Sequence, residues 1–177
     1  MEEFKEIIKR YFGEDSWDYN HTLAAVYWME KLIEKEGGDK RILIPAIYLH
    51  DIGYGKDIKS LQERISRKKI HMEEGAKEAE KILSKIGFSE DEIKEITHLI
   101  RIHDNFKELK TKNDFLIFEA DSHPQIDSER VTPSFTKEEY KNYLNYFKKE
   151  RLPRFKTATG KNYVEKLFAD AISKIAE

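Results

Sequence analysis

Cysteine is absent from the 177 residues of this sequence. Its absence excludes disulfides, thiolate metal sites and a cysteine nucleophile, so a metal site would have to use His, Asp and Glu side chains. The sequence also has no apolar run long enough to span a membrane, and its charged N-terminus lacks the layout of a signal peptide. We therefore expect a cytoplasmic protein.

A large excess of charge of either sign is missing as well. The formal net charge is -2, and the isoelectric point is about 6.3. This balance creates no overall positive field to attract nucleic acid or an acidic membrane surface, so we expect neither as a partner. Any phosphate binding must therefore be local.

Strand-like alternation is also missing, whereas apolar residues recur at helical spacing along most of the chain. The length is that of one domain, which buries roughly 70% of its unfolded surface. No repeat or linker divides the sequence, so we predict one all-α domain over residues 1–177. The expected helices are a first ended by Gly13, a second over about 18–36, a third capped by Asp39 and ending at His50 and Asp51, a fourth ending near Ile86, a fifth opened by Ser89, a short sixth over 115–121, a seventh opened by Thr136 and an eighth over about 161–175.

Proline is scarce, and Pro45 falls inside the expected third helix, where it predicts a kink or a late start. The segments 122–134 and 153–160 are expected to be ordered loops. The seventh helix carries an aromatic face from Tyr140 to Phe147. We expect this face in the core, and a homodimer surface is the alternative.

The pair His50-Asp51 closes an apolar run over residues 42–49 and precedes Ile52-Gly53. An imidazole and a carboxylate are suitable ligands for Zn, Fe, Mn or Co. The alternative is an ordinary helix C-terminus, at which a His interacts favourably with the helix dipole and an Asp begins a turn before glycine. The pair alone does not decide between these interpretations.

A metal site needs three or four ligands from different elements, so other inward-facing polar residues are the test. His21 shares a helical stripe with Trp28 and Leu32, although a single His there is more typical of a hydrogen-bonded core residue. Asp121 lies one turn beyond apolar residues, and a buried Asp is rare without a cation or several hydrogen bonds. For Asp121 the alternative is the capping of a turn before Pro124.

Four further histidines differ in their predicted orientation. His71 shares a helical line with Gly75, and His103 continues the apolar stripe of the fifth helix, so both are expected to face the interior. His98 lies nearly opposite that stripe and is expected near the surface. His123 is expected in a turn, at most beside the ligands.

The ordered set of His21, the His50-Asp51 pair and Asp121 on a helical chain resembles the HD-domain superfamily of metal-dependent phosphohydrolases. Three other segments extend the resemblance: 71–76 is similar to the helix that opens with a histidine, 100–103 to the Ile-x-x-His segment, and 119–121 to the segment with the last aspartate. The resemblance covers about residues 18–126, and it is weaker over 152–168. It implies an HD-type helical bundle of seven or eight helices.

The resemblance also implies how the site works. One divalent ion (Mn, Fe, Co, Ni, Zn or Mg) would be bound by His21, His50, Asp51 and Asp121. Such an ion polarises a phosphoryl oxygen and lowers the pKa of bound water. The catalytic candidates are Asp51, His71 and His103. The two histidines would bind phosphate oxygens, transfer protons or hold a second ion.

Basic residues gather between the His-Asp pair and His71, where cations could meet a polyphosphate. For any one of them, a solvated charge in a loop is the alternative. The segment contains Lys56, Arg64, Arg67, Lys68 and Lys69, of which Lys56, Lys68 and Lys69 are the substrate-binding candidates.

The resemblance thus implies a phosphohydrolase for a small phosphorylated compound, foremost a nucleotide, of the nucleotidase or nucleotide pyrophosphatase type. After Asp121 the chain continues Ser-His-Pro, where related proteins often have Arg-Leu-Asp, so the substrate identity does not transfer. The alternatives are a non-catalytic nucleotide-binding or interaction domain with a structural metal and, further removed, a di-iron oxygenase. A closed ligand set with no pocket beside it would favour the non-catalytic alternative.

Overall fold

The computed structural model describes residues 1–55, 63, 66–68, 70–133 and 136–176. Within these residues it contains eight α-helices and no strand, which confirms the predicted all-α class. The α-helices are α1 (Glu2–Phe12), α2 (Trp17–Glu36), α3 (Lys40–Leu49), α5 (His71–Lys85), α6 (Glu90–Ile102), α7 (Lys112–Ser122), α8 (Lys137–Tyr146) and α9 (Ala158–Ala176). Short helical turns are η1 (Ile52–Tyr54), η2 (His123–Gln125), the π-turn η3 (Phe147–Arg151) and η4 (Leu152–Arg154).

Local capping explains where several helices begin. Capping boxes at Ser89 and Thr136 open α6 and α8 as predicted, and a third one at Thr111 opens α7 three residues earlier than expected. The predicted late start of the third helix is wrong, because Asp39 caps α3 and the helix continues through Pro45.

The last helix begins at Ala158 rather than near residue 161. At its start, Oγ of Thr157 accepts from the backbone N–H of Gly160 at 2.9 Å, as an N-cap residue does. Oε1 of Glu119 in α7 accepts from the backbone N–H groups of Lys156 and Thr157 at 2.6 and 2.9 Å, and so attaches the segment before α9 to α7. The expected loops at 122–134 and 153–160 therefore contain the short turns η2 and part of η4 together with the start of α9.

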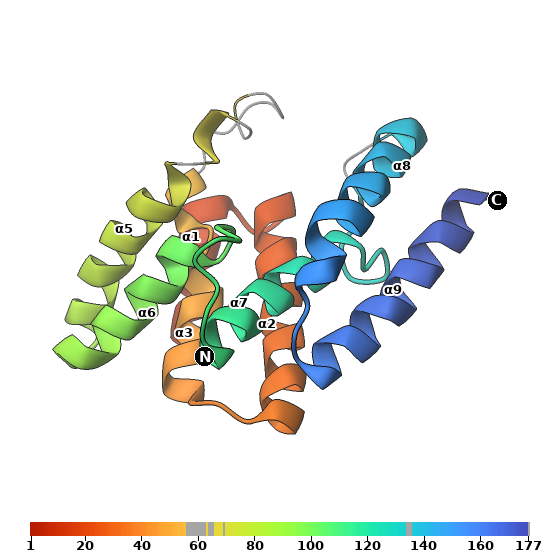
Figure 1. The fold of residues 1–177 in the computed structure, drawn as a ribbon. Coiled ribbons are helices and arrows are strands. Elements are labelled where there is room, and N and C mark those ends of the chain that lie inside the picture. Colours follow the sequence, from red (N-terminus) through yellow and green to blue (C-terminus); the bar gives the residue numbers. More distant parts are fainter. Residues whose placement is uncertain (56–62, 64–65, 69, 134–135, 177) are drawn as a thin grey trace.

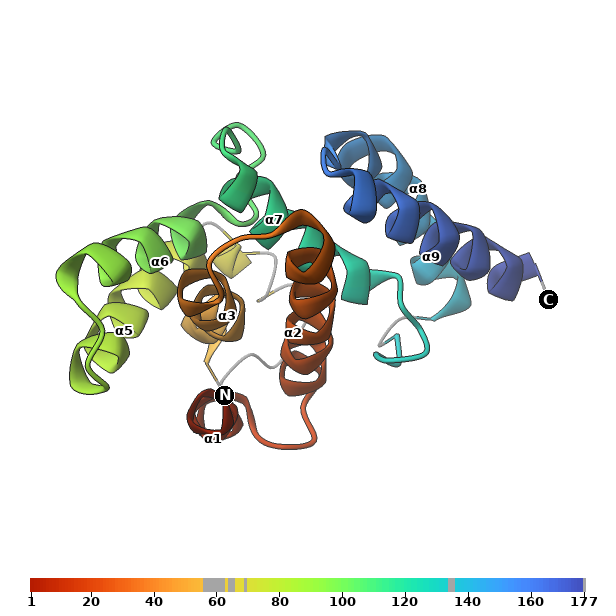
Figure 2. The same ribbon diagram turned by 90° about the horizontal axis from the view of Figure 1, so that it is seen from below.

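The helices form two outer pairs around a central group. In Figure 1, α5 and α6 lie on one side of α2, α3 and α7, whereas α8 and α9 lie on the other side. Figure 2 shows the same order from below, with α1 next to α3. The middle helix α7 thus lies between the two outer pairs.

Two hydrophobic clusters hold these helices together. The first core cluster joins α1, α2, α3, α5, α6 and α7, and it is mostly aliphatic, with Leu32, Leu49 and Leu83 fully buried. The second core cluster joins α7 to α8, η3 and α9, and it contains Phe118, Tyr140, Leu144, Phe147, Phe155 and Val164 among others. The predicted aromatic face is thus in the core, except that Tyr146 is 38% exposed.

None of the helices in the described part of the chain combines the length and apolarity that crossing a bilayer requires.

Candidate metal centre

Six buried histidine and aspartate side chains converge at the ends of helices. His21 lies in the second turn of α2, His50 and Asp51 follow α3, His71 opens α5, His103 follows α6, and Asp121 lies in the last turn of α7. None of the six is more than 6% exposed. The structure therefore brings together all four predicted metal ligands and both predicted accessory histidines.

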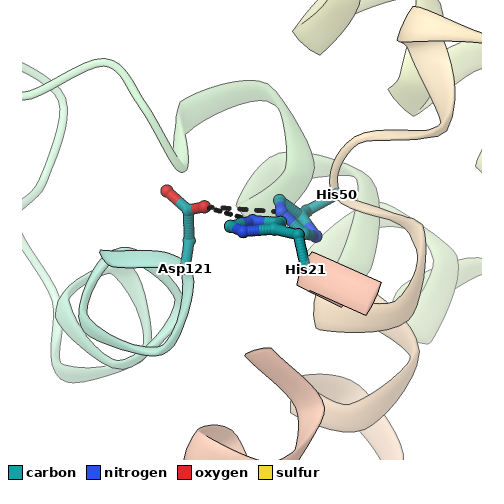
Figure 3. Close-up of side chains that lie close together, drawn as sticks. All are labelled: His21, His50 and Asp121. Atoms are coloured by element: carbon teal, nitrogen blue, oxygen red, sulfur yellow. Dashed lines mark hydrogen bonds and ion pairs between the residues drawn. The ribbon is translucent and has the colours of Figure 1, made fainter. Parts of the chain in front are cut away.

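His21, His50 and Asp121 form one group of donors. The Oδ1 atom of Asp121 lies 3.1 Å from Nε2 of His21 and 3.5 Å from Nε2 of His50. Figure 3 shows this oxygen facing both imidazole rings, while the other oxygen of Asp121 points away from them. The three donor atoms lie within 4.8 Å of one another, as the ligands of a single ion must.

His50, Asp51 and His103 form a second group, which shares His50 with the first. The Oδ2 atom of Asp51 lies 3.5 Å from Nε2 of His50, and its Oδ1 lies 3.5 Å from Nε2 of His103. His71 adjoins this group, because its Nε2 lies 3.4 Å from the same Oδ1. His50 is therefore the donor at which the two groups meet.

Backbone carbonyls fix the tautomers of two of these histidines. Nδ1 of His50 donates to the carbonyl of Ile47, and Nδ1 of His103 donates to that of Ile100, both at 2.8 Å. A carbonyl can only accept a hydrogen bond, so Nδ1 must carry the proton. Nε2 is then the nitrogen whose lone pair can coordinate a metal. Within the described residues, the buried Nε2 of His50 has no hydrogen-bond partner. A buried imidazole nitrogen that lacks a hydrogen-bond partner and lies near carboxylates is a suitable ligand for a metal cation.

The electrostatics of the cluster also favour a cation. Burial alone would raise the pKa of the Asp121 carboxyl, but the guanidinium of Arg151, the contact with His21 and the nearby charge of His50 hold this pKa well below its usual range. Although burial opposes it, the attraction of Asp51 and Asp121 raises the pKa of His50 to about 9. The two carboxylates therefore favour a positive charge at His50, which a bound proton supplies. A divalent ion bound to this imidazole would displace that proton.

A cavity of about 480 Å³ opens beside the cluster. Asp51, His71, His103, Asp121 and His21 contribute to its wall. The rest of the lining consists of aromatic and polar side chains: Trp17, Tyr54, Tyr143 and Tyr146 together with Lys68, Asp104, Gln125 and Arg151. The donors are thus accessible from a space large enough for a small molecule.

Two of the aromatic rings support histidines of the cluster. The ring of Trp17 stacks on that of His21 with centroids 4.8 Å apart, and the ring of Tyr54 stacks on that of His71 at 4.0 Å. Stacking restrains the orientation of an imidazole, because rotation about its side-chain bonds would break the ring contact.

The predicted basic residues have different positions. Lys68 lines the cavity, and its Nζ lies 2.8 Å from Oδ2 of Asp104. Arg67 instead donates to the backbone carbonyls of Gly53 and Tyr54, and so fixes η1. Lys56, Arg64 and Lys69 lie outside the described residues.

The position of Arg151 and the complete burial of His123 were not predicted from the sequence. Arg151 is 2% exposed and contacts Asp121 and Asp104, yet its sequence context, a run of Lys and Glu, is typical of a solvated surface. His123 is fully buried in η2, where it stacks on Trp28 and donates to the carbonyl of Gly160 at 3.3 Å. Burial lowers its pKa to about 4. His98 is exposed as predicted.

Comparison with known proteins agrees with this geometry. The family model of the HD domain matches residues 18–125, which include all six clustered donors. No curated protein matches the sequence. A crystal structure of a protein described as a predicted HD superfamily hydrolase, from an uncultured Thermotogales bacterium, superposes with a TM-score of 0.65 at 18% identity, covering 99% of this chain and 89% of that chain. At this identity the superposition demonstrates a common fold, whereas the family match spans more than half of the sequence: the chain belongs to the HD-domain family.

Proposed function

We propose that this HD-domain protein is a metal-dependent phosphohydrolase that acts on a small phosphorylated compound, foremost a nucleotide. Family membership and the cluster of imidazole and carboxylate donors indicate a metal-dependent hydrolase. The observation that carries the proposal further is that this buried cluster opens onto a cavity. A metal with a purely structural role needs no such access.

The donor set defines which ions fit. His21, His50, Asp51 and Asp121 offer nitrogen and oxygen atoms and no sulfur, a combination that suits Mn, Fe, Co, Ni, Zn or Mg. A divalent ion held there would act as a Lewis acid and lower the pKa of bound water toward neutrality. The group of Asp51, His71 and His103 has the donors for a second ion, so the number of bound ions is one of the quantities to measure.

We assign proton transfer to His71 and His103. Their Nε2 atoms lie 3.4 Å apart, both are close to Oδ1 of Asp51, and both residues line the cavity. Since Nδ1 of His103 is bound to a backbone carbonyl, Nε2 is the atom at which this ring exchanges a proton. Delivery of that proton to the leaving oxygen of a phosphate ester is general acid catalysis.

The lining of the cavity supports a nucleotide as substrate. Trp17, Tyr143 and Tyr146 provide flat faces on which a base can stack. The ammonium group of Lys68 is at the same cavity, and its side chain is 44% exposed, so it can exchange its contact with Asp104 for one with a phosphate. The aromatic rings would therefore contact the base of a nucleotide, and the ammonium group would contact its phosphate.

The proposal is tested by metal analysis and a panel of phosphorylated substrates. We expect the purified protein to bind a divalent ion and to release phosphate or pyrophosphate from nucleoside mono-, di- or triphosphates. H50A and D51A should each reduce kcat/KM by on the order of 1,000-fold, because a catalytic metal contributes several kcal/mol of transition-state stabilisation. The matched control is H98A, which removes an exposed histidine outside the cluster.

Two results would contradict the proposal: a protein that binds no metal, or H50A and D51A variants that keep full activity. Metal binding without turnover of any member of the panel would instead favour the non-catalytic alternative. Optical absorption typical of bridged iron would favour the oxygenase.

A further inference from the structure

Arg151 is a buried cation that lies beyond the residues matched by the HD-domain model. It is the last residue of the π-turn Phe147–Arg151, which continues α8. Single π-turns within helices occur frequently at functional sites, because the extra residue redirects the side chains that follow. Here the turn belongs to the second core cluster, yet Arg151 reaches the donors held by the first.

The guanidinium of Arg151 joins two carboxylates from different elements. Its Nη2 donates to Oδ2 of Asp121 at 2.7 Å, and its Nη1 donates to Oδ1 of Asp104 at 2.8 Å. Nη2 also donates to Oγ of Ser122 at 2.8 Å, and this hydroxyl in turn donates to the carbonyl of Phe118. The position of Arg151 is therefore fixed by hydrogen bonds in several directions.

These contacts determine which oxygen of Asp121 is available to a metal. Oδ2 is bound by Arg151, while Oδ1 faces His21 and His50 (Figure 3). Gln125 adds a weaker restraint, because its Nε2 lies 3.2 Å from each of the two oxygens. With Oδ2 engaged in this way, Asp121 presents a single oxygen to the cluster.

The second arm of Arg151 reaches the other half of the cluster. Asp104 directly follows His103, so its contact with Arg151 ties the end of α6 to the end of α7. The rings of Phe106 and Phe118 lie 5.5 and 5.0 Å from the guanidinium carbon. Aromatic faces and two carboxylates suit a planar guanidinium, whereas a lysine ammonium has no equivalent plane or fork.

We propose that Arg151 is the positioning residue of the metal centre. It makes Asp121 a ligand through Oδ1 alone, and it sets the separation between Asp121 and His103. It is not a catalytic residue, because its donors are engaged by two carboxylates and a hydroxyl. This inference rests on the proposed metal-dependent function.

The test measures metal binding to the full chain directly. Mn²⁺ affinity is measured by calorimetry, and the visible absorption of bound Co²⁺ reports ligand geometry, for the wild type, R151Q, R151K and the double variant R151Q/D104N. Loss of a nearby positive charge alone would strengthen cation binding. We instead expect R151Q to bind Mn²⁺ about 10- to 100-fold more weakly, because replacing a residue that orients metal ligands typically weakens metal affinity by this factor.

The other variants separate position from charge. R151Q/D104N removes one positive and one negative charge, and with Asp104 it also removes the carboxylate that R151Q would leave paired with Lys68 alone. We expect its Mn²⁺ affinity to remain weak. R151K should recover part of the affinity but not the wild-type Co²⁺ spectrum. The matched control is R154Q: Arg154 also stacks on Phe106, at 4.5 Å, and pairs with Glu150 in the same segment, so its loss should leave binding and spectrum unchanged.

Each outcome decides the inference. Wild-type affinity and spectrum in R151Q and R151Q/D104N would overturn it. If R151Q does not fold, as judged by circular dichroism, R151K carries the test, and a wild-type Co²⁺ spectrum in R151K would overturn it equally. A wild-type protein that binds neither Mn²⁺ nor Co²⁺ would overturn the proposed function itself, a failure distinct from metal binding that is insensitive to Arg151.

Discussion

The two core clusters differ in composition and in what they contribute to the site. The first is mostly aliphatic, and its helices or their adjoining residues provide all six donors of the candidate metal centre. The second is rich in aromatic residues, and its elements provide Tyr143, Tyr146 and Arg151 to the cavity. The two regions thus differ in their tasks: the first brings the donors together, and the second lines part of the cavity and contacts the donor Asp121 through Arg151.

The helix α7 belongs to both regions. Leu116, Ile117 and Ala120 pack in the first core cluster, whereas Phe118 packs in the second. Asp121 lies in the last turn of this helix, between the histidines of the first region and Arg151 of the second. We therefore expect the two regions to be coupled through α7 both in stability and in metal binding.

The largest expected effect tests whether the regions unfold together. Truncation of fully buried Leu32 in the first cluster should cost about 2–5 kcal/mol, and F147A in the second should cost about 3–5 kcal/mol. Because α7 is shared, each variant should still unfold in a single urea transition, measured by circular dichroism and tryptophan fluorescence. Two separated transitions would show instead that the regions are independent.

The next effect concerns a close backbone contact within the first region. A Cβ atom added at Gly53 would lie 2.0 Å from the carbonyl oxygen of His71 and 2.6 Å from the backbone nitrogen of Gly75. G53A must therefore push η1 away from α5, which should cost about 1–3 kcal/mol and reduce activity through displacement of Asp51 and His71.

The control for G53A is G55A. Gly55 has a φ of 67°, and among the described residues no atom lies within 4 Å of an added Cβ, so the substitution strains the local backbone without pushing on α5. We expect G55A to lower the free energy of unfolding in urea and to leave Mn²⁺ affinity unchanged. A G53A protein with wild-type stability and activity would contradict the close-contact argument.

A smaller effect tests the role of the second region in substrate binding. Y146A removes a partly exposed ring from the cavity wall, and loss of one aromatic contact of about 1 kcal/mol should raise KM for a nucleotide about 5-fold. Y146F keeps the ring and serves as the control. The effect should vanish with ribose 5-phosphate, which lacks a base, and an equal effect on both substrates would argue against stacking.

The smallest effect concerns a charge pair on the surface of the first region. The Arg41 side chain and then the Ser89 backbone N–H hydrogen-bond the Glu92 carboxylate and lower its pKa to about 2. The unfolded chain therefore takes up a proton first as the pH falls, so the contribution of Glu92 is complete above pH 4.5 and is lost toward pH 2.

The measurement is the difference in unfolding free energy between the wild type and E92Q from pH 7 to pH 3. It should shrink as the pH falls below about 4.5, and solvent screening should keep it small because the pair is exposed. A difference that grows on acidification would have the wrong sign for a lowered pKa.

Features that depend on neighbouring residues could be predicted from the sequence. The capping boxes at Ser89 and Thr136 and the inward positions of His71 and His103 follow from spacings of three or four residues. Asp121 was predicted to be buried because apolar residues precede it by one turn.

Features that depend on distant partners could not be predicted. The segment before α9 is attached to Glu119, almost forty residues earlier, and the burial of Arg151 requires Asp104 and Asp121 as partners. The sequence around His123 indicated a turn, and its complete burial arises from Trp28 and Phe155. In each case the missing information was which surfaces meet, rather than which local structure forms.

The hydrogen bonds of His50 and His103 have a wider consequence. Each residue lies one position beyond a helix, and each ring binds the carbonyl three residues earlier. A backbone carbonyl in the last turn of the helix thus orients the imidazole ring, a role that a second side chain often has at metal sites. Helix termination and ring orientation thus depend on the same residues. The two rings of the candidate metal centre are oriented by backbone carbonyls, and fraying of the last turn would displace the ring together with the helix end.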